Sequence, residues 1–221
     1  MYIPGFNSAE FYVGSPKACW FVPFQRNPRF VGRISEVTKI ESILSLENRC
    51  ERVAITGLGG VGKTQISLEF AYQLRQKYSD CSVFWIPAMN VEGMREAYLE
   101  IGRQLGIPNA EKEKADIKKL VQHHLSHESA GKWLLVFDNA DDIGMWIDID
   151  SNAAQSWRLI DYLPKSSHGS IVFTTRSLKT AVKLAGNNVI QVEEMDESVG
   201  KLLLSKSLIN QSLLTDHMAK L

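Results

Sequence analysis

The segment Gly57–Thr64 constrains this chain more than any other, because its sequence GLGGVGKT matches the pattern G-x-x-x-x-G-K-[ST]. A triphosphate needs backbone N–H groups that converge on its oxygens, and glycines keep side chains out of that approach. Such a loop must also begin a helix, because a helix N-terminus adds donors and positive potential. The segment therefore predicts a binding loop for a nucleoside triphosphate.

The individual positions of this loop have expected roles. Lys63 places a positive charge against the β- and γ-phosphates, and the hydroxyl of Thr64 reaches a magnesium ion. We expect the other contacts to come from the loop backbone and from the first turn of the following helix. The predicted nucleotide-binding residues of this segment are Gly57, Gly59, Gly60, Val61, Gly62, Lys63, Thr64 and Gln65.

Short apolar runs alternate with helical patterns along the chain. This alternation predicts an α/β fold, in which a parallel sheet is covered by helices on both faces. One helical pattern covers Lys63–Lys77, directly after the loop. The five predicted strands are Arg52–Thr56, Ser82–Ile86, Trp133–Phe137, Ser170–Thr174 and Asn188–Val192.

Polar residues follow two of these strands. Asp138 comes directly after Trp133–Phe137, and a carboxylate at the end of a buried strand suits a magnesium ion beside the phosphate loop. Asp141 and Asp142 follow in the sequence. The pattern leaves open whether they act in the site or form a solvated turn, and Asp142 is included as a further catalytic candidate.

Arg176 ends the segment SIVFTTR, which contains the fourth predicted strand. An arginine at the carboxyl end of a strand can reach the ligand crevice of an α/β sheet. Its guanidinium group could register whether a γ-phosphate is present. An ordinary surface arginine is the alternative. The predicted catalytic residues are therefore Lys63, Asp138 and Arg176, and the predicted metal ligands are Thr64 and Asp138.

Composition narrows the partners. Lys and Arg together number 25, as do Asp and Glu, so the formal net charge is zero. A neutral chain has no overall field that attracts nucleic acid or anionic membranes, and we expect no nucleic-acid partner. No run approaches the roughly 18 apolar residues of a membrane span. The three cysteines form no CxxC pair, which favours a reducing cytoplasmic location.

Four motifs together resemble the NB-ARC nucleotide-binding domain of the STAND class of P-loop ATPases, and within it the NOD-like receptors of fungi. The resemblance extends from about Phe21 to about Leu204. The motifs are FVPFQRNPRFVGR (Phe21–Arg33), ITGLGGVGKTQISLEFAY (Ile55–Tyr72), WLLVFDNADD (Trp133–Asp142) and SIVFTTR (Ser170–Arg176).

This resemblance implies the fold and several site residues. It implies a P-loop NTPase three-layer sandwich whose five-stranded sheet has the additional-strand order 5-1-4-3-2. It also implies that Phe30, Val31 and Arg33 lie against the adenine, and that Arg176 senses the γ-phosphate. The chain would divide into an irregular N-terminal arm (1–20), the NB-ARC domain (21–200) and the start of a truncated helical region (201–221).

The resemblance further implies a regulatory switch in signal transduction. In the family, ADP holds a closed monomer, and exchange for ATP permits self-association. Effector and repeat domains are the usual partners. This chain departs from the family at Asn139, where many relatives carry a second acid; an amide cannot take a proton, so we expect weak ATPase activity at best. The GLPL and Met-His-Asp motifs are also missing, which predicts either a fragment of a longer receptor or a C-terminally truncated member of the family.

Two other classes of function stay open. One is a catalytically active P-loop ATPase or small-molecule kinase, although no acceptor site or arginine-rich lid stands out. The other is an interaction module without nucleotide, against which the intact Lys63, Thr64 and Asp138 argue. No Asn-Lys-x-Asp motif for guanine is present. The expected ligands are therefore ATP or ADP with Mg²⁺.

Overall fold

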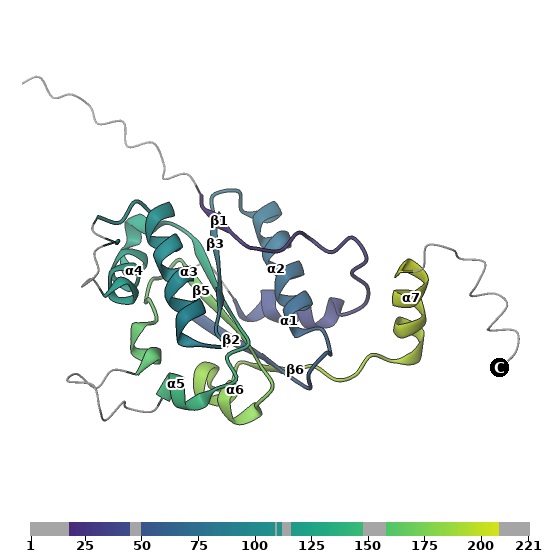
Figure 1. The fold of residues 1–221 in the computed structure, drawn as a ribbon. Helices are drawn as coiled ribbons and strands as arrows, with labels where there is room; N and C mark the ends of the chain where they lie inside the picture. Colours follow the sequence, from purple (N-terminus) through teal and green to yellow (C-terminus); the bar gives the residue numbers. More distant parts are fainter. Residues whose placement is uncertain (1–17, 45–49, 109, 112–115, 148–157, 208–221) are drawn as a thin grey trace, which may run out of the picture.

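A parallel sheet forms the centre of the molecule (Figure 1). The computed structural model describes residues 18–44, 50–108, 110–111, 116–147 and 158–207. Within these residues the sheet has six strands in the order β1-β3-β4-β5-β2-β6, and every neighbouring pair is parallel. The strands are β1 (Trp20–Phe21), β2 (Glu51–Thr56), β3 (Ser82–Pro87), β4 (Trp133–Asp138), β5 (Gly169–Thr175) and β6 (Val189–Gln191).

The expected strand order is confirmed, but the strand count was wrong. Read from β6, the five expected strands follow the order 5-1-4-3-2, and β1 adds a sixth strand beyond β3. β1 pairs through Trp20 with Val83 and through Phe21 with Phe84. Two residues are too few to display an alternating pattern, so the aperiodic arm gave no sign of this strand.

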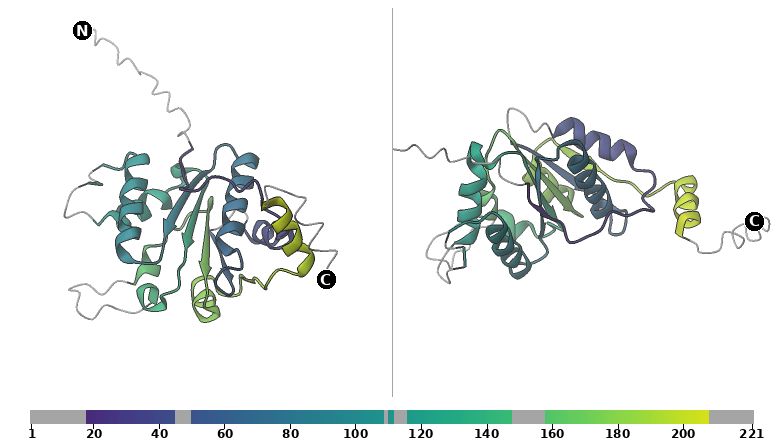
Figure 2. Two further views of the ribbon diagram at one scale, coloured as in Figure 1. Left: turned by 45° about the vertical axis from the view of Figure 1, so that its right-hand side comes forward. Right: turned by 90° about the horizontal axis from the view of Figure 1, so that it is seen from above.

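Helices cover both faces of the sheet (Figure 2). The core cluster on one face includes residues of α1 and α2, and the cluster on the other face includes residues of α3, α4, α5 and α6. The helices are α1 (Ile34–Ile43), α2 (Lys63–Lys77), α3 (Val91–Gln104), α4 (Ile117–Ser126), α5 (Ile143–Ile147), α6 (Leu178–Ala185) and α7 (Glu197–Ser207), with short 3₁₀ turns at Glu128–Ala130 and Leu159–Tyr162. None of these described helices is both long enough and apolar enough to cross a membrane.

β4 shows how the sequence divides its side chains between the two faces. All of its residues are buried, as its continuous apolar run predicts. Trp133, Leu135 and Phe137 belong to the cluster of α3 and α4, whereas Leu134 and Val136 belong to the cluster of α1 and α2. Asp138 is the last residue of β4 and therefore lies at the carboxyl edge of the sheet.

The two chain divisions expected from the resemblance fall within regular elements. The 20/21 division lies inside β1, and the 200/201 division lies inside α7. The region expected over 201–221 extends beyond the described residues from position 208 onward. The division into three segments stays a prediction. α7 follows β6 after an irregular stretch and covers neither face of the sheet (Figure 1).

The close contact between Gly169 and Trp133 generates a stability prediction. A Cβ atom at Gly169 would collide with the buried Trp133 indole, whose Nε1 donates to the carbonyl oxygen of Leu125 at 2.9 Å. We expect Gly169→Ala to lower the free energy of unfolding by about 1–3 kcal/mol, because a packed core resists added volume. Urea denaturation measures this change.

Gly200→Ala provides the matched control, since a Cβ at Gly200 in α7 meets nothing within 4 Å. We expect it to change stability by at most about 1 kcal/mol, in the stabilising direction. Equal effects of the two substitutions would contradict the packing argument.

Candidate nucleotide-binding site

The predicted phosphate loop connects the end of β2 to the start of α2. Gly60 and Gly62 have φ angles of 83° and 97°, which favour glycine. A Cβ atom on either residue or on Gly59 would meet nothing within 4 Å, so there is open space beside these three glycines. A Cβ on Gly57 would instead collide with the carbonyl oxygen of Val192, which follows β6. Gly60 and Gly62 therefore allow the positive φ angles of the loop, and Gly57 allows the chain after β6 to pass close to it.

Lys63, the first residue of α2, forms hydrogen bonds with the backbone of this loop. Its Nζ donates to the carbonyl oxygens of Gly57 at 2.9 Å and Leu58 at 2.8 Å. Burial lowers the pKa of Lys63, and the charge of Arg176 adds to this effect. The carboxylates of Asp141 and, to a smaller extent, Asp138 oppose the shift. The ammonium group is thus held by loop carbonyls that a phosphate group could replace.

The two predicted metal ligands contact each other. The hydroxyl of Thr64 donates to Oδ1 of Asp138 at 2.9 Å. The buried hydroxyl of Thr174 donates to the same oxygen at 2.6 Å and accepts from the backbone N–H of Asn139 at 2.8 Å. Burial raises the pKa of Asp138, and these hydrogen bonds partly offset the rise. A hydroxyl and a carboxylate in contact are hard oxygen ligands that fit Mg²⁺.

Arg176 is paired with Asp141. Its Nε donates to Oδ2 of Asp141 at 2.6 Å, and its backbone N–H donates to Oδ1 at 2.6 Å. The hydroxyl of Thr175 also donates to Oδ1, at 3.0 Å. Burial tends to raise the pKa of Asp141, but the hydrogen bonds from Arg176 and Thr175 prevail and lower it. Asp141, whose role the sequence left open, is therefore attached to the predicted γ-phosphate sensor.

The structure places Asp142 differently. Its side chain is exposed, and its Oδ1 accepts hydrogen bonds from the backbone N–H groups of Gly144 at 2.9 Å and Met145 at 3.4 Å. These contacts are those of a residue that caps the start of α5. No contact brings this carboxylate to the phosphate loop among the residues the structure describes.

Arg33 links the N-terminal arm to the loop. One of its guanidinium nitrogens donates to the carbonyl oxygens of Val61 at 3.1 Å and Glu193 at 2.7 Å, and another donates to Glu36 at 3.0 Å. Its backbone adopts a left-handed conformation, with φ of 57°, at the start of α1. Arg33 thus joins the arm, the loop and the chain that leaves β6.

The other two arm residues lie apart from this contact. Phe30 and Val31 line a cavity of about 370 Å³ that also involves residues of α1, α2 and α7. Gln65 accepts a hydrogen bond from the amide of Asn27 at 2.9 Å, which helps to fasten the arm to α2. The adenine role expected for Phe30, Val31 and Arg33 stays a prediction.

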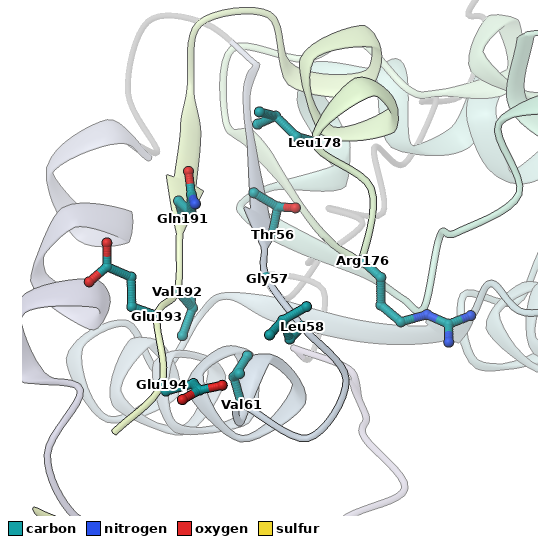
Figure 3. A pocket seen from close by; sticks show the side chains of 10 residues that line it. All are labelled: Thr56, Gly57, Leu58, Val61, Arg176, Leu178, Gln191, Val192, Glu193 and Glu194. Atoms are coloured by element: carbon teal, nitrogen blue, oxygen red, sulfur yellow. The ribbon is translucent and has the colours of Figure 1, made fainter. Parts of the chain in front are cut away.

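A second cavity, of about 380 Å³, adjoins the loop (Figure 3). It lies at the carboxyl ends of β2, β5 and β6, where open α/β sheets bind ligands. Figure 3 shows the guanidinium group of Arg176 pointing away from the other labelled residues. The sequence did not indicate the lining residues after β6, which are Val192, Glu193 and Glu194. They could have been expected, because the carboxyl ends of parallel strands meet at one edge of the sheet. The lining residues are Thr56, Gly57, Leu58, Val61, Arg176, Leu178, Gln191, Val192, Glu193 and Glu194.

Comparisons with known proteins relate this chain to one family model and to one curated relative. A family model described as an AAA domain matches residues 47–180, which include the phosphate loop, Asp138 and Arg176. A curated relative from Hyaloscypha variabilis, named a nucleotide-binding leucine-rich repeat (NLR)-like protein, is 48% identical over 197 residues. That match covers 86% of this chain and 20% of the relative, so the chain spans about one fifth of the relative's length.

Solved structures share the fold. Cdc6p from Pyrobaculum aerophilum has a TM-score of 0.58 and 17% identity, over 85% of this chain and 52% of that chain. The ORC1 protein from Aeropyrum pernix, in complex with DNA, has a TM-score of 0.54 and 13% identity, over 81% of this chain and 50% of that chain. At these identities the likeness shows the fold alone. The expectation that nucleic acid is not a partner rests only on charge balance and stays a prediction.

The buried carboxylate of Asp138 generates a prediction with two opposite effects. Because its pKa is raised, the folded chain loses stability as the pH rises through that pKa. We expect Asp138→Asn to raise the melting temperature of the nucleotide-free chain at pH 7, because an amide oxygen still accepts from Thr64 and Thr174 without a buried charge. Thermal melting at several pH values measures this, and the gain should vanish at acidic pH.

The same substitution removes an anionic metal ligand. We expect it to weaken Mg²⁺-dependent nucleotide binding by on the order of 10- to 100-fold. Titration of a fluorescent nucleotide with and without Mg²⁺ measures this loss. A variant that keeps its Mg²⁺ dependence would contradict the role assigned to Asp138.

Proposed function

The chain belongs to the AAA domain family, and from that premise we propose that it is the ADP/ATP-binding switch domain of a NOD-like receptor, of the NB-ARC type. The observation that carries this proposal is the contact between Thr64 and Asp138 beside the open glycine loop. The loop offers backbone donors to phosphates, and the contacting oxygens offer ligands to Mg²⁺. The name of the relative from Hyaloscypha variabilis supports the receptor part of the proposal.

The residues around the loop favour a switch over a fast enzyme. Asn139 follows Asp138 directly, and its amide cannot act as a general base for an attacking water. Arg176 is engaged by Asp141 instead of pointing into the cavity. The first feature removes a general base, and the second means that an ion pair must break before Arg176 can contact a γ-phosphate. Slow hydrolysis that resets the bound state is therefore the activity we propose.

The remaining parts of the proposal concern context. The chain spans about one fifth of its NLR-like relative, which supports a role as one domain of a larger receptor. Effector and repeat domains are the proposed partners, and self-association in the ATP state is the proposed output. A cytoplasmic location is proposed as well.

Removal of the Lys63 charge tests nucleotide binding directly. We expect Lys63→Ala to weaken ADP and ATP binding by at least about 100-fold, because a charge-assisted contact to the phosphates is lost inside the loop. Isothermal titration calorimetry with Mg²⁺ and each nucleotide provides the measurement. Lys39→Ala, which removes an exposed lysine of α1, is the matched control and should bind as the unaltered chain does.

The outcome distinguishes the functions. If the unaltered chain binds no adenine nucleotide at millimolar concentration, the proposal fails and an interaction module remains. Circular dichroism must show that Lys63→Ala keeps its fold, since the lysine also bonds two loop carbonyls.

The rate of hydrolysis separates a switch from an ordinary enzyme. We expect phosphate release below about 1 s⁻¹, the lower end of typical turnover numbers. Because a positioned general base contributes about 10²–10⁴-fold, we expect Asn139→Asp to raise the rate at least about tenfold. Faster turnover by the unaltered chain would favour an ATPase or a kinase, and transfer of phosphate to an added small-molecule acceptor would identify the kinase.

A further inference from the structure

Asp141 forms a compact set of contacts with the residues that end β5. Its Oδ1 accepts from the hydroxyl of Thr175 at 3.0 Å and from the backbone N–H of Arg176 at 2.6 Å. Its Oδ2 accepts from Nε of the Arg176 side chain at 2.6 Å. One oxygen therefore fastens the loop after β4 to the end of β5, and the other fixes the direction of the guanidinium group.

The carboxylate of Asp141 is the anionic partner of Arg176. It forms an ion pair with the guanidinium group, whose Nε lies 2.6 Å from Oδ2. The γ-phosphate of a bound nucleotide is the anion that Lys63 and a sensor arginine are expected to share.

We propose that Asp141 is a positioning residue that substitutes for the γ-phosphate as the partner of Arg176, so that the site favours the diphosphate until a triphosphate displaces this carboxylate from the arginine. This inference rests on the proposed switch function. The side chain of Asp141 is largely buried, with 25% exposed, whereas that of Arg176 is 68% exposed. The arginine is therefore the partner that can turn toward a ligand.

Charge favours such an exchange. A terminal phosphate carries about two negative charges and three acceptor oxygens, against one charge and two oxygens for a carboxylate. Exposure of the guanidinium group keeps the existing ion pair weak enough to break. The γ-phosphate must therefore bind Arg176 more strongly than Asp141 does. A nucleoside diphosphate has no γ-phosphate and leaves the ion pair intact.

Asp141→Asn is a selective test of this proposal. An amide oxygen in place of Oδ1 still accepts from Thr175 and from the backbone of Arg176, which keeps the loop in place. An amide NH₂ in place of Oδ2 cannot accept from Nε of Arg176. We expect the ratio of the diphosphate Kd to the triphosphate Kd to rise about fivefold, the scale of a partly screened ion pair. Competition of ADP and of a non-hydrolysable ATP analogue against a fluorescent nucleotide measures both constants.

The same substitution is also tested in a variant that lacks the guanidinium group of Arg176. In Arg176→Ala, the further change Asp141→Asn should leave this ratio without the fivefold rise, because no guanidinium remains to be released. A ratio that rises equally in both backgrounds would overturn the proposal, since general repulsion between Asp141 and phosphate would then explain it. A fall of the ratio in Asp141→Asn alone would overturn it too, because Asp141 would then hold Arg176 ready for the triphosphate.

Two further variants provide a control and an alternative to Asp141→Asn. Asp161→Asn breaks the ion pair between Asp161 and Arg158, which is separate from the cavity, and should leave the ratio unchanged. Thr175→Val removes one donor that fixes Asp141 and should raise the ratio by a smaller factor. If Asp141→Asn does not fold, an unchanged ratio in folded Thr175→Val overturns the proposal.

The two levels of inference fail in different ways. Absence of adenine-nucleotide binding by the unaltered chain would remove the switch function itself. Normal binding of both nucleotides, with a ratio that does not respond to Asp141→Asn, would remove only the role of Asp141.

Discussion

The hydrogen bonds to Oδ1 of Asp138 are the interaction on which the rest of the site depends. They join three parts of the chain that are distant in sequence: the start of α2 through Thr64, the end of β4 through Asp138, and the end of β5 through Thr174. The carboxylate is buried at some electrostatic cost, which the two hydroxyl donors reduce. This arrangement joins the phosphate loop to the edge of the sheet and keeps the two predicted magnesium ligands, Thr64 and Asp138, in contact.

A large part of this arrangement could be predicted from the sequence. The glycine loop, Lys63, Thr64 and Asp138 follow from local patterns, because each stands directly beside a strand or helix that periodicity identifies. The strand order came from the family resemblance and not from the residues themselves. β1 was missed because a two-residue strand carries no period, and its pairing with β3 depends on contacts across the sheet.

Other features could not be predicted because they arise only from tertiary contacts. Arg33 reaches both Val61 and Glu193, and nothing local in the sequence indicates either partner. Asp141 and Asp142 are adjacent acids with similar sequence context, yet one binds Arg176 and the other caps α5. The two acids contact different elements, and no local sequence pattern indicates which of them pairs with Arg176.

The left-handed backbone at Asn139, with φ of 63°, restricts which residues can replace it in evolution. Asn and Asp tolerate this conformation better than other residues with a side chain, because their short polar groups can bond locally. A single base change converts an Asn codon into an Asp codon, so an acid can return here with little backbone strain. A longer acid such as Glu would meet more resistance from the backbone. Under the proposed switch function, the lifetime of a bound triphosphate would therefore depend on a position where Asn and Asp can replace each other with little backbone strain.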